Sequence, residues 1–115
     1  MFRSFTITIA DTNYHNLFSL IVGTSVYGAA QGGSNETAIT GAVPSSGICP
    51  DEVYFVYLLP PAGGATLADN NNANNAGVAL PTAGLSIPAS RGINLKEMWV
   101  KLTTGGQALG VCFNV

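Results

Sequence analysis

The stretch that decides the fold is residues 94–115, NLKEMWVKLTTGGQALGVCFNV. Apolar side chains occupy every second position on both sides of a Thr-Thr-Gly-Gly turn, which is the pattern of two β-strands. The alternating apolar residues are Met98, Val100 and Leu102 before the turn, and Leu109, Val111, Phe113 and Val115 after it. Because a short glycine turn joins the two runs, the pattern predicts a β-hairpin that ends at the last residue.

The beginning of this stretch also allows a helical interpretation. Residues 94–97 have the spacing of a capping box and predict one turn of helix. The alternative to the first strand is a longer helix, whose apolar stripe would be Leu95, Met98, Trp99 and Leu102.

The N-terminal segment predicts a strand followed by a short helix. Phe5, Ile7 and Ile9 alternate with Ser4, Thr6 and Thr8, which indicates a half-buried strand over residues 2–9. After the polar break at residues 11–13 the period changes. Tyr14, Leu17, Phe18 and Ile21 lie at helical spacing and predict about two turns that end before Gly23.

The middle of the chain predicts one strong strand and several weaker segments. The run EVYFVYLL, Glu52–Leu59, is rich in β-branched and aromatic residues and predicts a central strand buried on both faces. The asparagine-rich segment 69–75 predicts an exposed loop, and 77–87 predicts an extended segment at a sheet edge. The stretch 28–47, rich in Gly, Ala, Ser and Thr, is expected to form a projecting loop or arm on the domain.

Short strands, Gly/Pro/Asn-rich turns and one short helix together define the expected fold class. The chain is expected to be mostly β, a jelly-roll or β-sandwich or a barrel-like fold, forming one domain over residues 1–115. No linker and no repeat of fixed period divides it.

The composition points to a protein whose surface is covered by neighbours. Hydrophobic residues make up 47% of the 115 residues and charged residues only 9%, against about 25% charged in an average soluble protein. We therefore expect self-association. The four basic residues are scattered and the net charge is −2, so neither a nucleic acid nor an anionic membrane is an expected partner.

The residues that usually carry catalysis are sparse. His15 is the single histidine and is expected to be a surface or capping residue; Asp51 and Glu52 are adjacent and would point to opposite faces of a strand. Cys49 and Cys112 are expected to be free thiols, with a disulfide as the alternative, and they do not form a zinc motif. We expect no catalytic, metal or cofactor site and no enzyme activity.

Aromatic residues supply the candidate contact surface instead. Tyr54 and Tyr57 fall within one apolar strand, where core or interface packing is expected. Trp99 would lie with Lys101 on the face opposite Met98, as a partner anchor or in a second layer of the core. The candidate interface residues are Trp99, Lys101, Tyr54, Tyr57 and Tyr27.

The order of these features resembles the small decoration or cement proteins that coat phage capsids. The segments that carry the resemblance are FTITIA, NLFSLI, EVYFVYLL, the Asn/Gly loop, PTAGLSIPAS, INLKEMWVKL and the TTGG turn. The resemblance implies a jelly-roll or related barrel, commonly a homotrimer, that binds the major capsid protein on the virion exterior. It implies no catalytic residue, and residues 28–47 depart from a compact barrel.

Two other functions stay open at this point. A carbohydrate- or receptor-binding module would use the asparagine loop and the aromatic residues to contact glycans. A small hydrolase would need acid residues brought together from distant segments. Since the N-terminus lacks the features of a secretory signal, we expect synthesis in the host cytoplasm.

Overall fold

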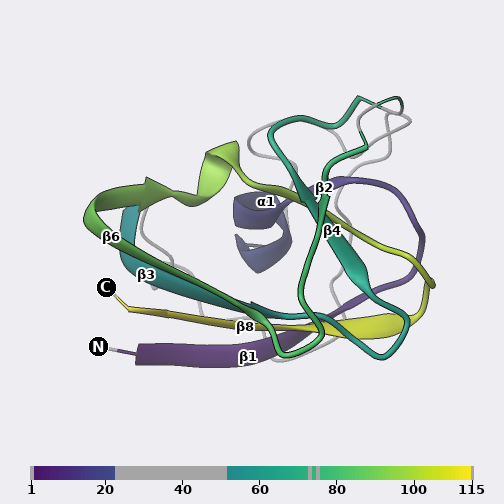
Figure 1. The fold of residues 1–115 in the computed structure, drawn as a ribbon, viewed down its shortest axis with the longest axis horizontal. Helices are drawn as coiled ribbons and strands as arrows, with labels where there is room; N and C mark the ends of the chain where they lie inside the picture. Colours follow the sequence, from purple (N-terminus) through teal and green to yellow (C-terminus); the bar gives the residue numbers. More distant parts are fainter. Residues whose placement is uncertain (1, 23–51, 73, 75, 115) are drawn as a thin grey trace.

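The computed structural model describes residues 2–22, 52–72, 74 and 76–114, so the predicted arm at 28–47 lies outside the described residues (Figure 1). Sheet A contains, in spatial order, β1 (Phe2–Ile9), β8 (Gln107–Asn114), β3 (Glu52–Leu59) and β6 (Leu85–Asn94). Sheet B contains β2 (His15–Asn16), β7 (Trp99–Leu102), β4 (Ala65–Ala68) and β5 (Val78–Ala79). The described helical elements are α1 (Leu17–Val22) and one turn of 3₁₀ helix, η2 (Leu95–Glu97).

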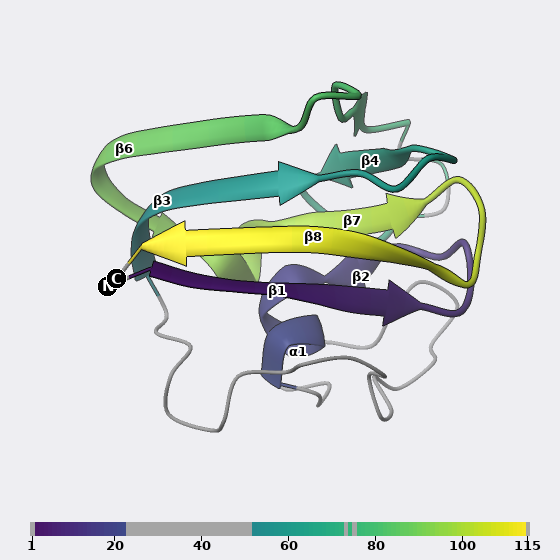
Figure 2. The same ribbon diagram turned by 90° about the horizontal axis from the view of Figure 1, so that it is seen from below.

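The strand order defines a jelly roll and confirms the expected fold class. Strands run antiparallel in both sheets, in the orders β1-β8-β3-β6 and β2-β7-β4-β5. Among the described strands, only β4 and β5 are both consecutive in the chain and paired. The two sheets lie face to face in Figure 2, with sheet A in front, and the termini meet at one end. The eight described strands, paired in this way, form the double-sheet jelly roll.

The core lies between the two sheets. Its fully buried members include Ile7, Val53, Val56, Leu58, Leu95, Val100, Leu102, Leu109 and Phe113. Helix α1 adds the buried side chains Leu17, Leu20 and Ile21, and it lies on the side where β1 and β2 form the sheet edges (Figure 2). One side of the sandwich is therefore closed by a helix.

The C-terminal strands form as predicted, but the predicted hairpin is wrong. Strand β7 pairs with β2 and β4, whereas β8 pairs with β1 and β3 in the other sheet. The connection crosses from sheet B to sheet A and is held by a loop and a strand end: Thr103 N–H donates to the Gly64 carbonyl (3.1 Å), and Gly106 N–H donates to the carbonyl of Ile9 at the end of β1 (2.8 Å). The apolar sides of β7 and β8 consequently face each other across the core.

The capping turn is confirmed at η2. The side chain of Asn94 accepts a hydrogen bond from the Lys96 N–H at 3.0 Å, and the turn ends after Glu97. The longer helical alternative is wrong, because residues 99–102 form β7.

Three further expectations need correction. Strand β3 is central in sheet A as predicted, but it is not buried on both faces, because Tyr54 is 56% and Leu59 42% exposed. Helix α1 begins only at Leu17, since Asn16 caps it by accepting the Ser19 N–H at 3.1 Å. His15, expected at the surface or as a cap, is buried in β2.

Candidate functional site

The outer face of sheet A is the side turned away from the core. Antiparallel partners lie on the same face, so the strand pairings define its members. Those whose side chains are described are Ser4, Thr6, Thr8, Phe55, Tyr57, Leu59, Ser86, Pro88, Ala108, Gly110, Cys112 and Asn114. None of these residues carries a charge. The described part of this face therefore combines uncharged polar side chains, such as Ser4 and Thr6, with the apolar side chains of β3.

Strand β3 supplies the apolar part of this face. Phe55 and Tyr57 are half-buried, and Leu59 is 42% exposed. Tyr54 lies at the register shift between Val53 and Phe55 and is 56% exposed. Cys112, opposite Tyr57, is a half-buried free thiol, as expected for this residue.

The other two described interface candidates lie on the opposite side of the molecule. Trp99 and Lys101 alternate with the buried Val100 on β7, which places them on the outer face of sheet B. Both are half-buried, and the Lys101 ammonium lies 4.9 Å from the centroid of the Tyr14 ring. Tyr27 falls outside the described residues. The structure therefore separates Tyr54 and Tyr57 from Trp99 and Lys101, and the four do not form one site.

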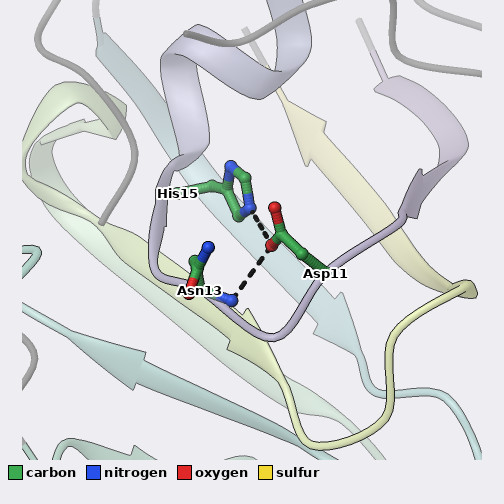
Figure 3. Close-up of polar contacts among 3 residues, drawn as sticks. All are labelled: Asp11, Asn13 and His15. Atoms are coloured by element: carbon green, nitrogen blue, oxygen red, sulfur yellow. Dashed lines mark hydrogen bonds and ion pairs between the residues drawn. The ribbon is translucent and has the colours of Figure 1, made fainter. Parts of the chain in front are cut away.

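A carboxylate–imidazole pair lies in the connection between β1 and β2 (Figure 3). His15 Nε2 is 2.7 Å from Asp11 Oδ1, and the same oxygen accepts the Asn13 N–H at 3.0 Å. The His15 side chain is 7% exposed and that of Asp11 43%. Sequence analysis assigned no partner to His15. The Asp-x-x-x-His spacing is the sequence signal for this pair. By itself it does not show that the turn brings the Asp11 carboxylate into contact with the His15 imidazole.

The electrostatics of this pair favour an ionised Asp11. Burial raises the pKa of Asp11, but the hydrogen bonds from His15 and from the Asn13 N–H outweigh it, and the pKa lies below the ordinary 3.8. Such a carboxylate orients and stabilises a neighbouring imidazole. Since Asp11 also binds the backbone of its own turn, we assign the pair to fixing the β1–β2 connection.

Tyr14, directly before His15, is fully buried. Desolvation raises the pKa of its phenol above the ordinary 10.0. The Lys101 ammonium over the ring is a cation–π contact. Lys101 is predicted from the sequence to be an interface residue. Through its contact with the Tyr14 ring it also stabilises the domain itself.

The described residues contain no cluster of three or more His, Cys, Asp or Glu side chains able to hold a metal ion. Within the same part of the chain, no helix is long and apolar enough to span a bilayer.

Comparison with known proteins does not assign this jelly roll to a family. No family model matches the chain, and neither the curated proteins nor the solved structures include a match.

Proposed function

We propose that this protein is a non-enzymatic virion structural protein, which associates with copies of itself and decorates or stabilises a capsid surface. The observation that supports the proposal is the outer face of sheet A, whose described side chains carry no charge, with Tyr54 and Leu59 exposed on its inner strand β3. Jelly rolls are a common architecture of viral coat proteins, and the low overall charge agrees with a protein whose surface is largely covered.

The size of this face suits an interface. Three strands of eight residues and one of ten, about 4.8 Å apart and rising about 3.4 Å per residue, cover roughly 550 Å² in projection. Protruding side chains increase the accessible area toward the roughly 800 Å² that each partner buries in a standard interface. Because the face has no described charge, two copies can approach it without like-charge repulsion.

A carbohydrate-binding module is the second function that the jelly-roll fold allows. Stacking on a sugar ring would require aromatic side chains gathered on one surface. Trp99 on sheet B lies apart from Tyr54, Phe55 and Tyr57 on β3 of sheet A, and Phe55 and Tyr57 are half-buried, so the predicted aromatic residues do not form one exposed platform. We therefore favour self-association over glycan binding.

Particle fractionation tests the proposal. The chain would carry an epitope tag in its native host, and particles would be separated on a density gradient. We expect the protein to migrate with filled particles and to be released by mild denaturant while the shell remains intact. Recovery of the protein only from the soluble fraction would contradict the proposal.

A further inference from the structure

The outer face of sheet A is uneven, because its two inner strands carry side chains of different size. The outward residues of β3 are bulky, and we call them the β3 ridge: Phe55, Tyr57 and Leu59. The outward residues in the first part of β8 are small, and we call them the β8 strip: Ala108, Gly110 and Cys112. Figure 2 shows β3 and β8 side by side in the middle of this sheet.

The step between the β3 ridge and the β8 strip is fixed by contacts on both strands. The Tyr57 hydroxyl donates to the Ala83 carbonyl at 2.6 Å and the ring lies against Gly84, so this side chain leans toward β6 and away from β8. Gly110 carries no side chain, and a Cβ atom at this position would lie 3.1 Å from the Leu59 Cβ. The height difference between the two strands is therefore a stable feature of the face.

Both edges of this face are accessible to a partner. Ser4 and Thr6 on β1 are exposed, and so are Ser86 and Pro88 on β6. The face covers roughly 550 Å² in projection, and its relief raises the area that contact can bury toward the roughly 800 Å² that each partner buries in a standard interface. The face is thus large enough for one dimer contact.

One row of paired residues crosses all four strands. Ser4 is paired with Cys112, Cys112 with Tyr57, and Tyr57 with Ser86. The boundary between β8 and β3 divides this row into two equal halves, with a small outward residue next to the boundary on one side and a bulky one on the other. The row therefore allows a direct comparison of the ways in which two copies can pack.

A twofold axis along this boundary matches the relief of one copy to that of the other. Sheets that pack face to face lie about 10 Å apart with their strands aligned within about 30°. An axis along the strands places the β3 ridge of each copy on the β8 strip of its partner. An axis across the strands would place ridge on ridge and leave a gap between the two strips. Since protein contacts are closely packed, the first arrangement is favoured.

We propose that two copies of this chain pack sheet A against sheet A about a twofold axis along the boundary between β8 and β3. Tyr57 of each copy then lies over Cys112 of its partner, and Ser86 lies over Ser4. Self-complementary faces of this kind are the rule in dimers with twofold symmetry. This inference rests on the proposed function, whose self-association it specifies, and it gives a dimer rather than the trimer that the resemblance implies.

Cysteine cross-linking tests the arrangement. In a Cys49→Ser/Cys112→Ser background, which has no other cysteine, one chain carries Ser4→Cys and a second, differently tagged chain carries Ser86→Cys. The two are co-expressed and treated with a short bismaleimide. We expect covalent dimers of one chain with the other, since the facing Cα atoms are about 10 Å apart. Either variant alone should give several times less, because its two cysteines lie about 17 Å apart across the axis.

Controls separate this pairing from self-association as such. Thr82→Cys, at an exposed turn position, measures cross-linking by random collision. Light scattering of the background chain measures association independently, and the exposed positions of Ser4 and Ser86 leave the fold intact on substitution. An associated chain that cross-links through Ser4→Cys alone, or not at all in the mixture, would overturn the pairing and leave self-association standing. A monomeric background chain would overturn both.

Discussion

The Tyr57 hydroxyl of β3 donates a 2.6 Å hydrogen bond to the carbonyl oxygen of Ala83, in the turn before β6. The ring thereby crosses the edge of sheet A and covers Gly84, where a Cβ atom would lie 2.3 Å from the phenol oxygen. Gly84 also has a positive φ of 94°, so the turn requires glycine for two reasons. This contact fixes the point at which the chain leaves sheet B and enters β6.

The first prediction separates the backbone strain at Gly84 from its steric contact with the Tyr57 ring. Gly106 also has a positive φ, 83°, but nothing lies within 4 Å of the position of its Cβ. Gly106→Ala should cost only the backbone strain, about 1–2 kcal/mol. Gly84→Ala should cost roughly 1–3 kcal/mol more, because the added methyl displaces the Tyr57 ring. Urea unfolding of both variants measures the difference.

A Tyr57→Ala background provides the control for this comparison. Without the ring, the free-energy cost of Gly84→Ala should fall to that of Gly106→Ala. A cost that stays unchanged would show that the ring contact is not what makes Gly84 necessary.

The second prediction concerns acid stability. Because the pKa of Asp11 is lowered in the folded protein, its stabilising effect is present above the unfolded value of about 3.9. It is lost as the pH falls through the lower, folded pKa. Asp11→Asn should therefore be less stable than the native chain at pH 6, and the two free energies of unfolding should converge near pH 2.

Asp69→Asn is the matched control, because Asp69 is an exposed aspartate outside the His15 contact. It should have little effect on the free energy of unfolding at either pH. A stability difference for Asp11→Asn that is the same at pH 2 and pH 6 would rule out ionisation of Asp11 as its cause.

The third prediction concerns β8, which lies between β1 and β3 in sheet A. Truncation after Gly106 removes the buried side chains Leu109, Val111 and Phe113. At about 1.5–3 kcal/mol for each fully buried side chain, their loss is comparable with the 5–15 kcal/mol stability of a domain. The truncated chain should show no cooperative melting transition by circular dichroism.

Point variants on β8 compare how much its core-facing and outward-facing side chains contribute to the free energy of unfolding. Leu109→Ala should cost about 2–5 kcal/mol. Cys112→Ala, on the outer face, should cost less than about 1 kcal/mol, because Cys112 is only half-buried. Equal costs would mean that the two faces of β8 do not differ in burial as described.

The β7–β8 connection shows which part of the fold the sequence predicts and which part it does not. Alternation identifies both strands and their buried sides, since this pattern is local. It does not identify the sheet that each strand joins. The hydrogen bonds from Thr103 to Gly64 and from Gly106 to Ile9 direct the strands into different sheets, and both partners are distant in sequence.

Strand β3 shows why the candidate site was harder to predict than the fold. The apolar residues Phe55, Tyr57 and Leu59 produce the pattern of a strand buried on both faces. Sequence alone does not distinguish burial in the core from an outward apolar face.

We propose that copies of this protein associate through the outer face of sheet A. Light scattering at micromolar concentration tests it most directly, with Tyr54→Lys/Leu59→Lys as the disrupting variant and Thr82→Lys, an exposed turn position, as the control. We predict a mass that is a multiple of 11.8 kDa for the native chain and the control, and a monomer for the double variant. A native chain that remains a soluble 11.8 kDa species, or a double variant that still associates, would contradict the claim.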